Sequence, residues 1–180
     1  MAITTGTHEA VGEDVRPAGR YHSNQIAIHW LVVSLVILQF LTGGTMAAAM
    51  EYGYDFNALP PAGVIYVHGI FGLSILTAML VRAVLRMRHG APEPPENESR
   101  PIQILSRSTH YAFYGVLIAM PIFGLFAVLT LNETIGLIHA WSSWLLLAII
   151  ALHVAGAFMH IFKRDGIIKR VITGQPPRID

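Results

Sequence analysis

Four long apolar runs dominate the chain, and polar segments rich in proline, glycine and charge separate them. A helix needs roughly 20 mainly apolar residues to cross the hydrocarbon core of a bilayer. Each run reaches that length, so the pattern predicts an all-α fold, an integral membrane four-helix bundle. The predicted spans are about 26–50, 64–85, 111–131 and 138–162.

The polar segments between and around these runs predict the domain organisation. We expect an N-terminal tail at 1–24, a four-span membrane domain at 25–165 and a C-terminal tail at 166–180. The segment EYGYDFNALPPAG reads as a turn-rich loop, and LNETIG links the last two spans. The prolines and charges of RMRHGAPEPPENESRPIQILSR predict an exposed connector.

Composition agrees with a membrane protein and excludes several kinds of site. Charged residues make up 13% of the chain, against roughly 25% in soluble domains. The absence of cysteine excludes disulfides, thiolate zinc sites, iron–sulfur clusters and covalent c-type haem. A net charge of +1 does not indicate nucleic-acid binding. The predicted spans contain no Asp or Glu, which counts against ion transport.

The basic residues predict how the chain lies in the membrane. All 12 Lys and Arg residues fall on one side of the predicted spans, and only Glu51, Asp55 and Glu133 fall on the other. Lys and Arg are enriched in cytoplasmic segments. We therefore expect both termini to be cytoplasmic.

Four histidines lie at two depths within the apolar runs. His29 and His153 are near the basic, cytoplasmic side, whereas His68 and His139 are near the opposite side. His139 and His153 are 14 residues apart, which is about 21 Å of helical rise and about 40° of rotation. The fourth span thus offers imidazoles to one interior at two levels, with His29 as the inner counterpart and His68 as the outer one.

Two facing imidazoles can bind a haem iron from both sides, and helical bundles build such sites between facing helices. Other interpretations remain: each histidine could hydrogen-bond to a neighbouring helix, or the group could hold a metal such as zinc. Zinc sites usually add carboxylates or thiolates, which these spans lack. The paired depths favour two haems, each with two histidine ligands.

The stretches IAIHW, YVHGIFGLSIL, AFYGVLIAMPIFGL and LHVAGAFMHIFK resemble the four spans of prokaryotic cytochromes b561, over roughly residues 21–172. The resemblance implies a multi-pass protein of the bacterial inner membrane that holds two haem b groups. It implies His29 and His153 as ligands of the inner haem, and His68 and His139 as ligands of the outer haem. The family moves electrons to or from ubiquinone or another quinone, and some members oxidise superoxide.

The resemblance also implies a quinone site near the cytoplasmic face. His160, two turns after His153, resembles the quinone-site histidine of the family; the alternative is an interfacial imidazole that contacts headgroups or a haem propionate. Some relatives place a lysine in the middle connector, where this chain offers only Arg100 and Arg107. The other histidines carry no assigned role: His110 opens the third span without an evident partner, and the rest lie in polar segments, at His8, His22 and His89.

Two functions are therefore expected. One is an autonomous cytochrome, a superoxide:quinone-type oxidoreductase or else an electron carrier, that transfers electrons between an external donor and quinone. The other is a haem-bearing membrane anchor of a larger dehydrogenase or hydrogenase complex. A haem-free scaffold is a third interpretation. The partners considered are lipid, quinone, a redox protein and a second copy of the chain in a homodimer.

Overall fold

The computed structural model describes residues 23–89 and 99–163, and the regular structure in these residues is entirely helical. The four helices are α1 (Ser23–Phe56), α2 (Ala62–His89), α3 (Arg100–Thr130) and α4 (Glu133–Lys163). Each is long and apolar enough to cross a membrane. The prediction of an all-helical chain with four such helices is confirmed, while the predicted tails lie almost wholly outside the described residues.

The helices are longer than the apolar runs that predicted them. α1 continues to Phe56 and α2 begins at Ala62, so most of the segment predicted as a turn-rich loop is helical. α2 ends at His89 and α3 begins at Arg100, so both ends of the predicted connector are helical, and its last part remains largely exposed. Pro101 lies in the first turn of α3, where its missing N–H breaks no helical hydrogen bond and its fixed φ suits the helix.

Local backbone geometry ends α3 and starts α4 within a very short link. Leu131 adopts a left-handed conformation (φ 46°, ψ 38°) directly after α3, so the residue predicted to end the third span lies just outside the helix. The Asn132 side-chain oxygen then accepts a hydrogen bond from the Ile135 N–H at 3.0 Å. This side chain satisfies one of the free N–H groups at the start of α4, and the link turns the chain back on itself.

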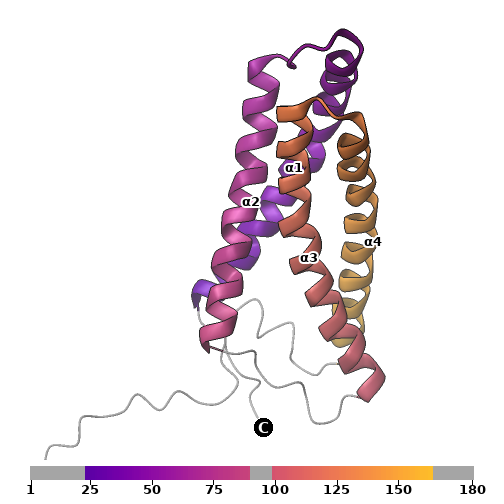
Figure 1. The fold of residues 1–180 in the computed structure, drawn as a ribbon. Coiled ribbons are helices and arrows are strands. Elements are labelled where there is room, and N and C mark those ends of the chain that lie inside the picture. The colour runs from indigo at the N-terminus through magenta and orange to yellow at the C-terminus, as the bar shows by residue number, and fades with distance from the viewer. Residues whose placement is uncertain (1–22, 90–98, 164–180) are drawn as a thin grey trace, which may run out of the picture.

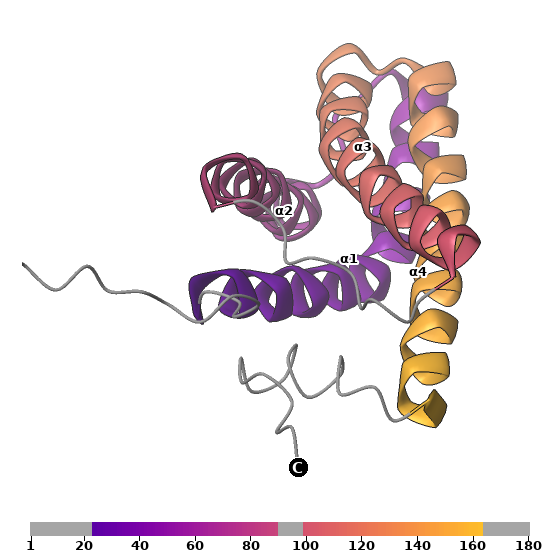
Figure 2. The same cartoon turned by 90° about the horizontal axis from the view of Figure 1, so that it is seen from below.

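The bundle consists of two antiparallel hairpins. α1 packs along α2, α3 packs along α4, and α2 joins the hairpins by packing on α3 (Figure 2). By contrast, α1 and α4 pack only weakly, because their backbones come close at isolated positions. A buried apolar cluster occupies the middle of the bundle and comprises Val32, Leu35, Val36, Ile75, Ala78, Met79, Leu117 and Leu146.

Charges in the described residues are separated by sign between the two ends of the bundle. The links α1–α2 and α3–α4 lie at one end, and the start of α1 and the end of α4 lie at the other (Figure 1). We call the first the acidic end, because it carries Glu51, Asp55 and Glu133. The opposite end, the basic end, carries Arg82, Arg86, Arg88, Arg100, Arg107 and Lys163.

Candidate functional site

Two histidines face each other near the acidic end, and we call them the outer pair. His68 of α2 and His139 of α4 have ring centroids 6.2 Å apart and ring planes inclined at 79°. Each is in the second turn of its helix. Because α2 and α4 both begin at the acidic end, the two imidazoles reach the same depth.

Hydrogen bonds fix the ring orientation in the outer pair. The Nδ1–H of His139 donates to the Met120 carbonyl at 2.8 Å. The Thr42 hydroxyl donates to the Leu38 carbonyl at 2.9 Å, so its oxygen is left to accept from Nδ1 of His68 at 3.2 Å. An imidazole that donates from Nδ1 keeps the lone pair of Nε2 for a metal. Both rings therefore present a metal-binding nitrogen.

A glycine of α3 provides the space that His139 occupies. A Cβ atom at Gly124 would lie 2.9 Å from Cε1 and 3.1 Å from Nδ1 of the His139 ring. Those distances are shorter than van der Waals contact, so any other residue would displace the ring. Gly43 of α1 is less constrained, since its added Cβ would lie 4.0 Å from Cε1 of His68.

Three histidines gather near the basic end, and we call them the inner cluster. His29 of α1 and His153 of α4 have ring centroids 6.5 Å apart, inclined at 57°. His110 of α3 lies 5.2 Å from His153 in an edge-to-face arrangement, and its Nδ1–H donates to the Ser106 carbonyl at 2.7 Å. Phe113 also packs edge-to-face on His153, with ring centroids 5.4 Å apart.

The contact of His110 with His153 was not predicted, although the sequence contains a signal for it. His110 lies 20 residues before the end of α3 at Thr130, and His153 lies 20 residues after the start of α4 at Glu133. Antiparallel helices joined by a short link place such residues side by side. The short link thus predicts the contact once both helix ends are known.

An arginine of α2 joins the inner cluster. Nη1 of Arg82 donates to the Gln25 carbonyl of α1 at 3.2 Å, and the guanidinium is close enough to interact electrostatically with all three imidazoles. Arg82 follows His68 by 14 residues, the same spacing that separates His139 from His153. In the sequence, Arg82 counted only as one of the basic residues that orient the chain, although this repeat of spacing is visible there.

The residues predicted for a quinone site share the basic end but differ in burial. His160 is half-buried near the end of α4, and Arg100 and Arg107 are exposed in the first turns of α3. Three histidines of the polar segments were assigned no role. His8 and His22 lie outside the described residues, and so does the side chain of His89.

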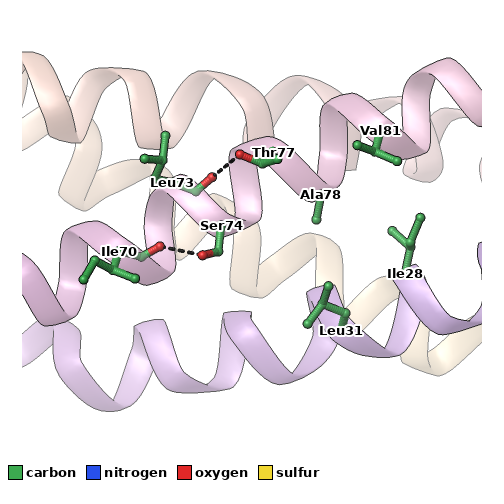
Figure 3. Close-up of a pocket in the computed structure, with 8 residues that line it drawn as sticks. All are labelled: Ile28, Leu31, Ile70, Leu73, Ser74, Thr77, Ala78 and Val81. Carbon is green, nitrogen blue, oxygen red and sulfur yellow. Dashed lines mark hydrogen bonds between the residues drawn. The ribbon is translucent and has the colours of Figure 1, made fainter.

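A groove of about 470 Å³ lies between α1 and α2, away from these polar residues (Figure 3). The hydroxyl groups of Ser74 and Thr77 donate to the carbonyls of Ile70 and Leu73 at 2.8 and 2.9 Å. Because both hydroxyl hydrogens are donated within α2, the groove presents a mainly apolar surface. Its lining residues are Ile28, Leu31, Ile70, Leu73, Ser74, Thr77, Ala78 and Val81.

The spacing of the facing rings suits a metal held between them. An imidazole–metal bond is roughly 2 Å long and the ring centre is about 1.1 Å beyond the nitrogen, so two trans imidazoles have centroids about 6.2 Å apart. The observed separations are 6.2 and 6.5 Å. The described residues contain no group of three or more His, Cys, Asp or Glu that could hold a metal ion.

Comparisons with known proteins identify relatives of this chain. Residues 20–174 match the family model described as prokaryotic cytochrome b561. Cytochrome b562 of Cereibacter sphaeroides is 38% identical over 76 residues, which cover 41% of this chain and 46% of that protein. A probable superoxide oxidase CybB of Yersinia pestis is 30% identical over 107 residues, 59% of this chain and 56% of that protein. These two matches span about half the length of each relative.

A third relative aligns over nearly its whole length. Cytochrome b561 homolog 2 of Escherichia coli is 24% identical over 176 residues, which cover 85% of this chain and 91% of that protein. The residues matched by the family model include all four helices and both levels of histidines.

Proposed function

Because the chain belongs to the prokaryotic cytochrome b561 family, which implies a bacterial membrane protein with haem b, we propose that it is a di-haem cytochrome that carries electrons across the bilayer. The donor would react at the acidic end, and a quinone would react near the basic end. The enrichment of basic residues at that end supports a cytoplasmic position for both termini. The membrane domain would comprise residues 25–165.

The observation that carries this proposal is the presence of two facing imidazole pairs at two depths. His68 and His139 would hold one haem, and His29 and His153 the other. Each centroid separation would let both imidazoles of a pair bind the same iron. When bound, each haem would supply one-electron oxidation and reduction.

The chain itself would position the two sites and keep them dry. His139 and His153 lie about 21 Å apart along α4, which is most of the thickness of a bilayer core. The buried apolar cluster around Ile75, Met79 and Leu117 lies between the two levels and excludes water. One helix therefore fixes the distance between both sites.

The proposed quinone site uses half-buried His160, with Arg100 and Arg107 at the same end of the bundle. Quinone carbonyls accept hydrogen bonds, and imidazole and guanidinium groups donate them. The name of the Yersinia pestis relative, a probable superoxide oxidase, supports superoxide as the electron donor to test first.

A pyridine haemochrome assay on the purified chain tests the proposal. We expect about two haem b groups per chain, both extractable by acidic acetone and none covalently attached. A preparation made with ample haem supply that contains no haem would refute the proposed function. Reduction of the purified chain by superoxide and reoxidation by a quinone would distinguish the autonomous cytochrome from a membrane anchor that needs a partner subunit.

A further inference from the structure

Arg82 carries a charge at a depth where charge is costly. The side chain is half-buried in α2, two turns before the helix ends at His89. A charged group inside a membrane bundle needs a compensating partner and marks a functional contact. The hydrogen bond from Arg82 to the Gln25 carbonyl has a neutral acceptor, which does not compensate the positive charge.

The carboxylates of the described residues cannot compensate Arg82. Glu51, Asp55 and Glu133 all lie at the acidic end, across the apolar core from the inner cluster. In the described part of the chain, Arg82 instead interacts electrostatically with three histidines, His29, His110 and His153. The inner cluster is therefore a site for an anion that the described chain does not provide.

Arg82 is also at the level of the proposed inner haem ligands. Its spacing from His68 equals the spacing of His153 from His139, so α2 presents a guanidinium where α4 presents an imidazole. Arg86 lies one turn closer to the basic end, with its guanidinium carbon 5.9 Å from the Tyr111 ring centroid. The cationic groups thus lie on one side of the inner cluster.

We propose that Arg82 binds a carboxylate of the haem held by His29 and His153, an inference that rests on the proposed function. Haem b carries two propionate groups, and a guanidinium binds a carboxylate through two parallel hydrogen bonds. Arg82 then anchors the haem from α2, while the ligands come from α1 and α4. Lipid phosphate is the other source of an anion, but phosphates lie at the membrane surface, where exposed Arg88 is better placed.

The test uses the full chain with its haems in membranes. Redox titration measures the midpoint potential of the spectral component that His29→Ala removes. The variants compared are Arg82→Gln, Arg82→Lys and the matched control Arg88→Gln. Loss of a cation beside a haem disfavours the reduced form, so Arg82→Gln should lower this midpoint potential. We expect about a tenfold change in the redox equilibrium, ~59 mV for one electron, with Arg88→Gln unchanged.

A second measurement identifies the anion. Infrared redox difference spectra of protein whose haem propionates carry ¹³C contain a carboxylate band that shifts with the label. Arg82→Gln and Arg82→Lys should both move this band, because neither side chain reproduces the two-point contact of a guanidinium. Unchanged bands in a folded variant, including the charge-retaining Arg82→Lys, would overturn the proposal. So would a midpoint potential that follows the anionic-lipid content of the vesicles instead.

These outcomes are separate from failure of the proposed function. If the wild-type chain lacked the component that depends on His29, the di-haem assignment would fail before any Arg82 variant was made. If both haems bind normally and Arg82 variants match wild type, only the carboxylate contact is refuted.

Discussion

At the scale of single residues, the outer pair depends on a hydroxyl group that touches no metal. Thr42 accepts a hydrogen bond from Nδ1 of His68 and so fixes the ring with Nε2 free. Thr42→Val removes this acceptor and should weaken haem binding at the outer site roughly 10–100-fold. Haem retention during dilution of the purified protein measures the loss.

Thr130→Val is the matched control for this substitution. Its hydroxyl also donates to the carbonyl one turn earlier, that of Phe126, at 2.7 Å, but it is exposed at the end of α3. It should retain both haems. Equal retention in Thr42→Val and wild type would show that the hydrogen bond does not orient His68.

Gly124 allows a second prediction at this scale. A methyl group at this position would overlap the His139 ring, and overpacking of this kind costs about 1–3 kcal/mol. Gly124→Ala should therefore reduce the haem content from two per chain toward one, with loss of the outer spectral component. Gly115→Ala is the control on the same helix, because a Cβ there meets nothing within 4 Å.

At the scale of helices, α4 supplies one imidazole to each site, so its two histidines should behave independently. His153→Ala should remove the same spectral component as His29→Ala, and His139→Ala the same one as His68→Ala. Each variant should lose about half of its haem, measured by haemochrome content and low-temperature spectra. The pairing is wrong if His29→Ala and His68→Ala abolish one common component.

A variant of His110 tests whether a ring that merely contacts a proposed haem ligand is itself a ligand. Its ring contacts His153, but the proposed axial ligands are already complete without it. His110→Phe should keep both haems and both spectral components. Loss of the inner component in this variant would instead make His110 a ligand.

The existence of the helices was predictable because length and apolar composition alone decide it. The positions of the helix ends were not predictable from hydropathy, because residues such as Pro101 and Leu131 set them through their backbone conformation. The same limit applies to the site. Four histidines could be paired from spacing along the helices, whereas the contacts of Thr42 with His68 and of Arg82 with Gln25 become recognisable only when α1 and α2 are known to be neighbours.

At the scale of the whole molecule, the acidic and basic ends would face different reaction partners. If His160 hydrogen-bonds a quinone carbonyl, His160→Ala should keep both haems and slow oxidation of the pre-reduced protein by a soluble quinone analogue. One hydrogen bond of about 1 kcal/mol corresponds to roughly a 3- to 10-fold effect. Stopped-flow absorbance measures the rate.

Met159→Ala is the neighbouring control, because this side chain is exposed in the same turn of α4. It should match wild type in haem content and in rate. Wild-type kinetics in His160→Ala would refute a role in quinone binding, and a changed haem spectrum would make His160 part of the inner site instead.

The weak packing between α1 and α4 has a consequence for biogenesis. Each hairpin can enter the bilayer as a unit, but under the proposed ligation both cofactor sites include α4 and one helix of the first hairpin. The chain would then be unable to complete either site until its last helix has been inserted. In haem-starved cells the two hairpins would remain loosely joined through α2 and α3, and membrane proteases would degrade the chain faster than its mature form.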